Sequence, residues 1–241
     1  MLDIPEKNSI FAITDTHFCD NSSNQEIKDF FSFLELVREK GDKLFLLGDI
    51  FDFYFEYKSL LPKSFFEIFC ELKKTSKEGL EIHYWPGNHD FWVGDFVRNL
   101  GIIIHSGPEI INIGNRKILV QHGDEMDSKF MLKVLLKNRA LRTIFSWIHP
   151  EAGFALAKRI SRFSRTNSKR NNLNSGQLKN YAEKKFREGI DAILMGHLHL
   201  PYFYEKDDKI LAILGDWLHY RSFGIISNGK ISLRRFNQSP R

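Results

Sequence analysis

The chain has 241 residues, of which 42% are hydrophobic and 27% are charged, and its net charge is +5. This composition is that of an ordinary globular protein, and it excludes a disordered, collagen-like or coiled-coil chain. The two cysteines are too few for a disulfide framework and lack the spacing of a zinc ribbon, which predicts a reducing, cytosolic setting. We expect neither a secretory signal nor a membrane-spanning helix, because no apolar run approaches about 20 residues.

The positive charge is concentrated in residues 129–170, which contain eleven basic residues and one acidic residue, Glu151. This segment therefore carries a charge of +10, and the rest of the chain carries −5. Positive charge concentrated in one segment in this way predicts an anionic partner: a nucleic acid, a phospholipid surface or a phosphorylated substrate. The alternative is a basic helical face that contacts only solvent, although solvation alone does not require charge of one sign over so long a segment.

The first half of the chain alternates short apolar runs with segments of helical periodicity. Buried strands are predicted at 9–15, 43–49 and 80–87, and helices at 24–40 and 65–77. This order of strand, helix, strand, helix and strand predicts a parallel sheet with helices packed against it.

The second half is richer in strands and contains one long helical block. Gly114-Asn115 is the predicted turn of a hairpin between strands at 110–113 and 117–121. The block spans 128–187, with a break at His149-Pro150 and a polar loop at 166–176. A buried strand follows at 191–195, and the last strands, predicted to be antiparallel, lie at 202–205, 210–214, 223–227 and 230–235. We expect a mixed α/β fold in a single domain, residues 1–241, with a helical cap inserted at about 125–188.

Polar residues directly follow five of the predicted strands. Each motif alone is weak, because aspartate and glycine are common in turns and a histidine beside a strand is often structural. Their conjunction argues against chance, since each follows an apolar run and each offers an oxygen or nitrogen ligand. Ligands collect at the carboxyl ends of strands in α/β sheets, so we expect the motifs to meet there. The motifs are Asp15-Thr16-His17, Gly48-Asp49-Ile50-Phe51-Asp52, Gly87-Asn88-His89-Asp90, His122-Gly123-Asp124 and Gly196-His197-Leu198-His199.

These motifs offer carboxylate, amide and imidazole groups and no thiolate. Such ligands suit Mn²⁺, Fe²⁺, Zn²⁺ or Mg²⁺. Seven ligands are more than one tetrahedral metal uses, and they fit two metals that share a bridging carboxylate. Two cations about 3.5–4 Å apart clamp a phosphoryl group and activate water at neutral pH. The motifs therefore predict a dinuclear centre for phosphoryl chemistry.

As a set, the five motifs resemble those of the calcineurin-like metallophosphoesterase family over nearly the whole chain. The resemblance implies a four-layer α/β/β/α sandwich with a helical cap insertion, and it implies two divalent metal ions, for which we expect Mn²⁺. It also implies that Asp49 bridges the ions, that His89 and Asn88 are catalytic, and that the catalytic residue Asp90 orients His89. The remaining ligands that it implies are Asp15, His17 and His199 for one ion and Asn88, His122 and His197 for the other.

Within the family, three segments resemble those of the UDP-2,3-diacylglucosamine pyrophosphohydrolases of lipid A synthesis. They are 48–52, the Asn-Ser-Lys-Arg-Asn-Asn segment at 167–172, and Leu-Gly-Asp-Trp at 214–217. This resemblance implies a hydrolase that cleaves the diphosphate of UDP-2,3-diacylglucosamine to UMP and 2,3-diacylglucosamine 1-phosphate. Two positions depart from that group, which has arginine in place of His89 and lysine in place of Ser175. The substrate contacts that it implies are Asp127, Ser168, Asn172 and His197.

The predicted cap combines its basic residues with an apolar stripe. Such a surface would sequester acyl chains, bind the diphosphate and contact anionic lipid headgroups. We therefore expect a cytoplasmic protein that binds peripherally to the inner face of the cytoplasmic membrane, with a lipid-linked sugar nucleotide as substrate and no obligate protein partner. The alternative is that the stripe only packs against the sandwich. The stripe comprises Met131, Leu135, Leu141, Ile144, Phe145, Trp147, Phe154 and Phe163.

Two other functions fit part of this pattern. The basic cap would equally bind DNA or RNA phosphates, and His89 in place of arginine favours a metal-dependent phosphodiesterase or nuclease acting on nucleotides or nucleic acid. A non-catalytic binding module on the same scaffold should have lost ligands, whereas every ligand position here is filled. An apolar tunnel beneath the 128–188 helices would favour a lipid substrate, and a shallow basic groove would favour nucleic acid.

Overall fold

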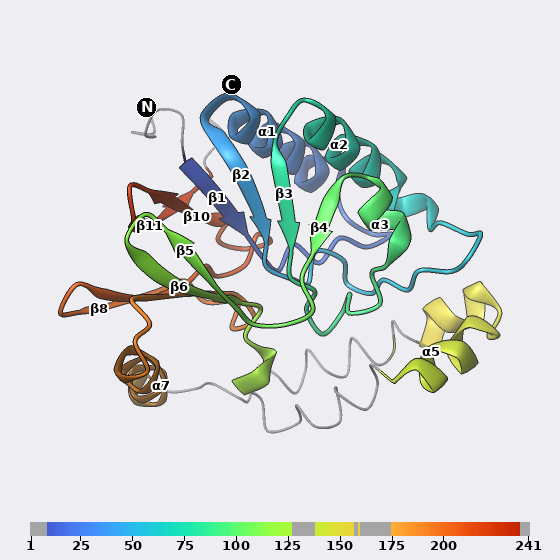
Figure 1. The fold of residues 1–241 in the computed structure, drawn as a ribbon. Helices are drawn as coiled ribbons and strands as arrows, with labels where there is room; N and C mark the ends of the chain where they lie inside the picture. Colours follow the sequence, from blue (N-terminus) through green and yellow to red (C-terminus); the bar gives the residue numbers. More distant parts are fainter. Residues whose placement is uncertain (1–8, 127–137, 157–158, 160–174, 237–241) are drawn as a thin grey trace.

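The structure is a computed structural model that describes residues 9–126, 138–156, 159 and 175–236. Two β-sheets lie face to face, with helices on the outer side of each (Figure 1). The first sheet has the strand order β11-β10-β1-β2-β3-β4, and the second has the order β5-β6-β7-β9-β8. In chain order the strands are β1 (Ser9–Ile13), β2 (Gly41–Leu46), β3 (Glu81–Tyr84), β4 (Ile102–Ile104), β5 (Glu109–Ile113), β6 (Arg116–Gln121), β7 (Ala192–Met195), β8 (Tyr202–Lys206), β9 (Lys209–Ile213), β10 (Ser222–Ser227) and β11 (Lys230–Arg235).

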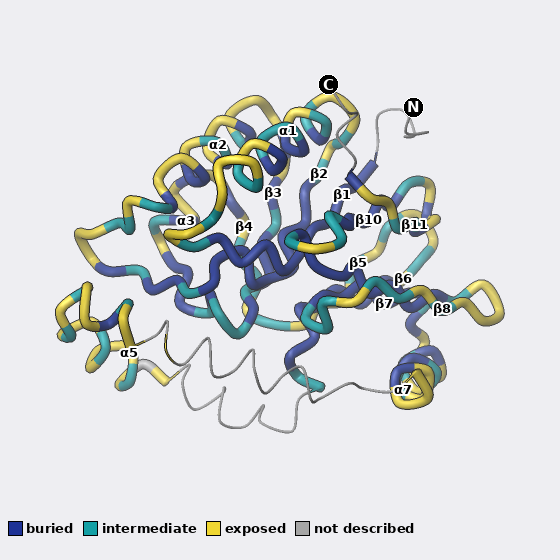
Figure 2. Tube along the Cα trace, turned by 180° about the vertical axis from the view of Figure 1, so that it is seen from behind, coloured by how far each residue is buried: buried dark blue, intermediate teal, exposed yellow. Residues whose placement is uncertain are grey.

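Helices α1 (Asn24–Lys40) and α2 (Phe66–Lys77) cover the outer face of the first sheet, and α7 (Ser175–Arg187) lies against the second. Their inward faces are buried and their outward faces are exposed (Figure 2). Helix α1 begins at a capping box, in which Ser23 Oγ accepts from Glu26 N and the Glu26 carboxylate accepts from Ser23 N. The predicted helices at 24–40 and 65–77 are thus confirmed to within a residue.

Three buried apolar layers hold the four layers of secondary structure together. The first, which includes Phe33, lies between the first sheet and helices α1 and α2. The second lies between the two sheets and includes Phe45 and Leu194. The third lies between the second sheet and α7 and includes Phe186 and Ile193. The predicted α/β/β/α sandwich is therefore confirmed.

Parallel pairing gathers strand ends at one edge of each sheet. Strands β1 to β4 run parallel, and β6, β7 and β9 run parallel in the second sheet. The hairpin β5–β6 forms over Gly114-Asn115, as predicted. The prediction that the last strands are antiparallel is confirmed for the pairs β8–β9 and β10–β11. Strand β9 also pairs with β7, and that pairing, which was not predicted, is parallel. Its buried apolar run is typical of a central parallel strand.

The predicted helical block is described only in part. Helix α5 (Arg139–Ser146) ends before His149 and residues 150–156 are helical, so the break at His149-Pro150 is confirmed. The prediction of a loop at 166–176 is wrong for its last two residues. Ser175 and Gly176 form the start of α7, because they precede the buried face of that helix, which starts at Leu178. The rest of that loop lies outside the described residues. A cap insertion at about 125–188 in a single domain stays a prediction.

Four short elements were not predicted from the sequence. They are η1 (Lys63–Phe65), α3 (Asp95–Asn99), β4 and η2 (Asp124–Met126). Each has three to five residues, too few to show a hydrophobic period. Among the described residues, no helix is both long and apolar enough to cross a membrane.

Candidate metal centre

The five motif loops meet at the edge of the sandwich where β1, β2, β3, β6 and β7 end. Backbone hydrogen bonds join the loops within each sheet. His17 N donates to Asp49 O, and Gly196 N donates to His122 O, each with a donor–acceptor distance of 2.9 Å. His122 Nδ1 lies 2.7 Å from the carbonyl oxygen of Leu47 and so links the two sheets. The loops are therefore held together independently of any bound ion.

The backbone of the motif loops is strained. Five of the seven expected ligands have left-handed φ angles between 46° and 68°, a region that residues other than glycine rarely adopt. Such conformations cost about 1–3 kcal/mol each, and they persist where the surrounding structure enforces them, often at functional sites. The five residues are Asp15, His17, Asp49, His197 and His199.

Six of the seven expected ligands, all but Asn88, form three overlapping groups of side chains together with the catalytic candidate His89. The ligand atoms within each group lie within 4.8 Å of one another. Asp49 and His17 each belong to two groups, so the groups are continuous, and Asp49 lies between the two ends of the cluster. The groups are Asp15 with His17 and His199, His17 with Asp49 and His89, and Asp49 with His122 and His197.

Both buried carboxylates have one oxygen held by the protein. Asp15 Oδ2 accepts hydrogen bonds from Thr14 Oγ1 (2.7 Å) and from His197 N (2.8 Å). Asp49 Oδ1 accepts one from His89 N (2.8 Å). These bonds fix both carboxylates and direct their second oxygens, Asp15 Oδ1 and Asp49 Oδ2, toward the histidine rings.

The second oxygens face imidazole nitrogens at distances longer than hydrogen bonds. Asp15 Oδ1 lies 3.6 Å from His17 Nε2 and 3.7 Å from His199 Nε2, and Asp49 Oδ2 lies 3.4 Å from His122 Nε2. Asp15 Oδ1, His17 Nε2 and His122 Nε2 are buried without a hydrogen-bond partner among the described residues. Because buried polar atoms without partners are costly, these atoms fit a bound cation.

The charges in this cluster set the ionisation of its carboxylates. Burial would raise the pKa of Asp15, but the neighbouring His17 and other imidazoles hold it at about 2. Burial also opposes ionisation of Asp49, yet His122 and other imidazoles hold the pKa of that carboxyl well below its usual range. Both carboxylates are therefore ionised at neutral pH, which is the form that binds a divalent cation.

A sequence model of the family described as calcineurin-like phosphoesterase matches residues 9–201, a range that includes all five motifs. The chain belongs to this family. It is 29% identical over 218 residues to a protein of Porphyromonas gingivalis named UDP-2,3-diacylglucosamine hydrolase, and the match covers 80% of this chain and 83% of that protein. A protein of Vibrio cholerae with the same name is 26% identical and covers 81% of this chain and 87% of its own. Among solved structures, an archaeal phosphodiesterase is similar, with 15% identity, a TM-score of 0.49 and coverage of 94% and 98%.

These comparisons and the cluster of ligands agree on the general activity. The phosphoesterase is a metal-dependent hydrolase, and its His and Asp groups are suited to divalent metals. Its mixed α/β architecture of two sheets and covering helices is that of the family.

The catalytic candidate His89 of this phosphoesterase has its ring fixed from one side. His89 Nδ1 lies 2.7 Å from the carbonyl oxygen of Asp52, which assigns the ring proton to that nitrogen. Burial lowers the pKa of His89, and the charge of Asp49 opposes that shift. His89 Nε2 lies 3.9 Å from Asp49 Oδ2, so it faces the middle of the cluster.

The prediction that Asp90 orients His89 is wrong. Asp90 is fully buried and accepts hydrogen bonds from Ile50 N (2.7 Å), Gly87 N (2.7 Å) and the hydroxyl of Tyr84. The carboxylate therefore joins the loop after β3 to the loop after β2. It is a structural residue, and Asp52 takes the place that the sequence analysis gave to Asp90.

The remaining expected site residues fall into two groups. Asn88 is half-buried in the loop after β3, directly before His89. The expected substrate contacts Asp127, Ser168 and Asn172 lie outside the described residues. Those three assignments stay predictions.

Two carboxylates beside the cluster were given no role from the sequence. Asp52 Oδ1 lies 3.8 Å from His17 Nδ1, and Asp216 Oδ2 lies 3.7 Å from His199 Nδ1. Asp52 is the last residue of the Asp49 motif, and Asp216 is the third residue of the Leu-Gly-Asp-Trp segment. The motifs therefore pointed to these two residues, but their contacts with His17 and His199 depend on how the loops fold, which the sequence does not show.

Two motif glycines allow the carboxylates to approach. A Cβ atom on Gly87 would lie 2.2 Å from Asp49 Oδ1. One on Gly196 would lie 2.1 Å from Thr14 Oγ1 and 2.8 Å from Asp15 Oδ2. These glycines are thus required by close packing around the ligands, beyond any role in ending strands.

An aromatic cluster begins next to the metal-ligand loops and reaches α5. Phe53 follows Asp52 in the chain, and its ring centroid lies 5.8 Å from that of Phe145 on α5. The ring of Trp92 lies 5.0 Å from the same ring. The full cluster consists of Phe53, Phe55, Tyr57, Phe91, Trp92, Phe145 and Phe154.

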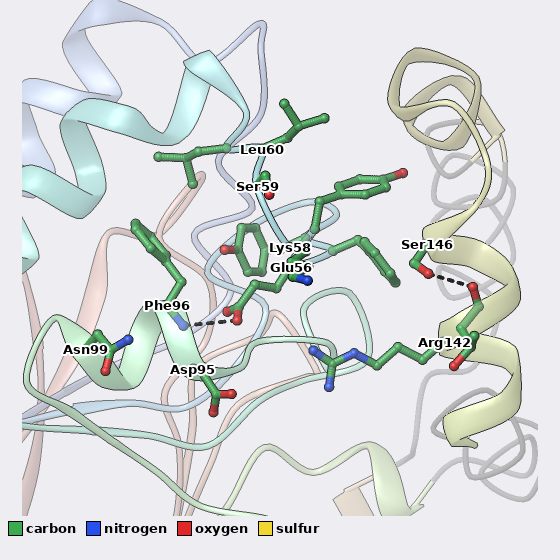
Figure 3. Close-up of a pocket in the computed structure, with 14 residues that line it drawn as sticks. Glu56, Lys58, Ser59, Leu60, Asp95, Phe96, Asn99, Arg142 and Ser146 are labelled. Carbon is green, nitrogen blue, oxygen red and sulfur yellow. Dashed lines mark hydrogen bonds between the residues drawn. The ribbon is translucent and has the colours of Figure 1, made fainter.

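A cavity of about 680 Å³ lies between α5, α3 and the 54–61 loop. Figure 3 shows the side chain of Arg142 extending from α5 into it, toward Glu56 and Asp95. Glu56 is held by the N–H groups of Gly94 and Phe96 at 2.8 and 3.0 Å. None of the seven expected metal ligands lines this cavity, so it is distinct from the metal centre.

Proposed function

We propose that this phosphoesterase hydrolyses the diphosphate of UDP-2,3-diacylglucosamine to UMP and 2,3-diacylglucosamine 1-phosphate. The observation that carries the proposal is the match to relatives named UDP-2,3-diacylglucosamine hydrolase over 80% or more of the chain. Phe53 and Phe91, the partly buried rings of the aromatic cluster that lie next to the metal-ligand loops in the chain, support it, because acyl chains need an apolar surface within reach of the reacting phosphate.

Two ions would be held at the two ends of the ligand cluster. One would be bound by Asp15, His17, Asp49 and His199, and the other by Asp49, Asn88, His122 and His197. The position of Asp49 between the groups supports its role as the bridge. Mn²⁺ is the ion that we propose, and the carboxylate and imidazole ligands, without thiolate, are compatible with it.

The bound cations would supply Lewis acidity and an activated water for attack on the α-phosphate. The residues of the chain position the substrate. Because His89 Nδ1 donates to the carbonyl of Asp52, Nε2 is the nitrogen that would contact the substrate. In the imidazolium form, which an anionic diphosphate favours, Nε2–H donates to a nonbridging phosphate oxygen and stabilises the developing charge. Asn88 would assist from the preceding position, and His197 would contact substrate as well as metal.

The predicted membrane partner belongs to the same proposal. Ile144 on α5 is 62% exposed, and Trp147, directly after that helix, is 86% exposed. The basic residue Arg159 is also exposed. Exposed aromatic and basic residues together suit a surface of anionic lipid. The enzyme would then act peripherally on the inner face of the cytoplasmic membrane, where it meets its lipid-linked substrate.

A substrate panel tests the proposal. UDP-2,3-diacylglucosamine, a cyclic nucleotide and single-stranded DNA are compared at equal concentration with Mn²⁺-loaded enzyme. We expect release of UMP from the lipid substrate to exceed the other reactions by at least about a hundredfold. Faster cleavage of DNA or a cyclic nucleotide would instead support the phosphodiesterase or nuclease that His89 in place of arginine favours.

Metal dependence is measured in the same assay. Chelation should abolish turnover and Mn²⁺ should restore it. Asp49→Ala should remain folded and lose essentially all activity, because both ions share this carboxylate. Normal turnover by Asp49→Ala contradicts the mechanism.

A further inference from the structure

The loop between β9 and β10, residues 214–221, runs beside the metal centre. Trp217 N donates to the carbonyl oxygen of Asp15 over 3.3 Å, which ties the loop to a proposed ligand. The side chain of Asp216, the residue before it, is buried although it is charged. A buried carboxylate needs partners, and those of Asp216 are histidines and backbone N–H groups.

The two oxygens of Asp216 have different surroundings. Oδ1 accepts hydrogen bonds from the backbone N–H groups of His219 (2.8 Å) and Tyr220 (3.2 Å). Oδ2 lies between two imidazoles, 2.8 Å from His219 Nδ1 and 3.7 Å from His199 Nδ1. One oxygen therefore caps the turn, and the other faces the ring of His199.

The ring of His199 has a carboxylate on each side. Its Nε2 lies 3.7 Å from Asp15 Oδ1, inside the ligand cluster, and the ring stacks on His17 with centroids 5.1 Å apart. Its Nδ1 faces Asp216. An imidazole binds a metal through an unprotonated nitrogen, and a carboxylate near the other nitrogen favours the required tautomer and ring orientation.

We infer that Asp216 is a positioning residue that holds His199 with its proton on Nδ1 and its Nε2 directed at the metal. This inference rests on the proposed ligand role of His199. His219 has a different part, because its side chain is 77% exposed and its ring lies on the solvent side of the carboxylate. It shares Oδ2 with His199, and its removal leaves Asp216 facing His199.

The alternative is that Asp216 only caps its own turn. Asp216→Asn separates the two roles, because the amide oxygen can still accept from the N–H groups of His219 and Tyr220. The amide nitrogen then replaces the oxygen opposite His199 and cannot accept a proton from Nδ1. If Asp216→Asn does not fold, Asp216→Ser takes its place, since its hydroxyl oxygen can also cap the turn.

Mn²⁺ binding is measured by calorimetry on the wild-type protein, Asp216→Asn, the control His219→Ala, and His199→Ala as the reference for loss of the ligand. We expect Asp216→Asn to weaken the affinity for one of the two ions by about ten- to a hundredfold. His219→Ala should stay within about twofold of wild type. The melting temperature of each metal-free protein is recorded to show that the turn is intact.

Each outcome separates this inference from the proposed function. Wild-type affinity in Asp216→Asn, with weakened binding in His199→Ala, overturns the role of Asp216 and leaves the metal centre in place. An equal loss of Mn²⁺ affinity in His219→Ala and Asp216→Asn also overturns it, because the conformation of the turn, and not the Asp216 carboxylate, would then determine the affinity. Wild-type binding in His199→Ala overturns the ligand assignment itself. No substrate is used, so the identity of the substrate does not affect the result.

Discussion

Gly87 packs against the proposed bridging carboxylate more closely than any side chain would allow. In Gly87→Ala, the new Cβ would lie 2.2 Å from Asp49 Oδ1 and 2.7 Å from Asp49 N, so Asp49 has to move. Displacing a group in the reacting geometry by about 1 Å costs about a hundredfold in rate, and we expect kcat to fall by at least that factor. Gly107→Ala is the matched control, because a Cβ there meets no described atom within 4 Å. Wild-type kcat in Gly87→Ala would contradict the packing argument.

A second set of histidines lies away from the metal centre and links β3 to the start of β5. His83 Nε2 lies 2.5 Å from Glu81 Oε1, and His83 Nδ1 lies 2.9 Å from His105 Nε2. The other nitrogen of His105, Nδ1, contacts Glu109. Burial, and to a smaller extent the nearby charges of His105 and Lys43, lower the pKa of His83 below its ordinary value of 6.5, although Glu81 opposes the shift.

This shift predicts how stability depends on pH. As pH falls through about 6.5, the unfolded chain takes up a proton at His83 before the folded protein does, so the free energy of unfolding decreases. Above that pH, His83 is neutral in both the folded and the unfolded state, so it does not change how the free energy of unfolding depends on pH. His83→Gln should remove part of the decline between pH 7 and pH 5.5, measured by urea unfolding of the metal-free protein. If the free energy of unfolding falls equally with pH in wild type and His83→Gln, His83 is not the group that causes the decline.

At the scale of single residues, the sequence predicted which side chains would gather and missed what some of them do. Asp15, Asp49 and His122 could be identified because each directly follows an apolar strand. The role of Asp90 could not be predicted, because its hydrogen-bond donors come from Tyr84 and from Ile50 in another loop. The contact between Asp216 and His199 likewise depends on how the loops after β7 and β9 fold against each other.

Among the elements, α5 is attached to the sandwich through aromatic rings. The ring of Phe145 lies 4.7 Å from that of Phe55 and 5.0 Å from that of Trp92. In Phe145→Ala we expect a loss of about 2 kcal/mol in local stability, because the ring is only partly buried. Hydrogen exchange should become faster in α5 and stay unchanged in β1 and β7. Unchanged protection of α5 would mean that other contacts hold it in place.

Elements with a long or buried apolar run were predictable, and the four elements of three to five residues, η1, α3, β4 and η2, were not. The bounds of α1 were predicted to the residue, because the helical period of 24–40 is followed directly by Gly41. The pairing of β9 with β7 was not predicted, because the Asp207-Asp208 turn between β8 and β9 indicates their hairpin but says nothing about β7. Only tertiary packing places β9 between β7 and β8 in its sheet.

On the scale of the whole molecule, the proposed membrane surface makes a separate prediction. Trp147, directly after α5, is 86% exposed, and burying such a side chain in the lipid interface is worth about 1.5–3 kcal/mol. Trp147→Ala should therefore weaken binding to vesicles that contain anionic phosphatidylglycerol by tenfold or more, as measured by co-sedimentation at low salt. Ile110→Ala, which removes an exposed apolar residue from β5, is the control. Equal binding by wild type and Trp147→Ala would contradict this orientation on the membrane.

The whole molecule also sets the limit of what the sequence could predict. The parallel sheet with its helices followed from the alternation of strands and helices, and the four layers followed from the resemblance carried by the five motifs. The placement of the predicted cap did not follow from the sequence, because its apolar stripe fits packing against the sandwich and contact with lipid equally well. The aromatic rings between α5 and the ligand loops show that at least Phe145 and Phe154 pack inward.

The claim on which the account depends is that Asp49 lies between two cations. Crystals of the full chain grown with Mn²⁺ and measured at a wavelength where manganese scatters anomalously test it directly. The account predicts two anomalous peaks about 3.5–4 Å apart, with the Asp49 carboxylate contacting both, Asp15 at one and His122 at the other. A single peak, or two peaks of which one lies away from Asp49, would contradict it.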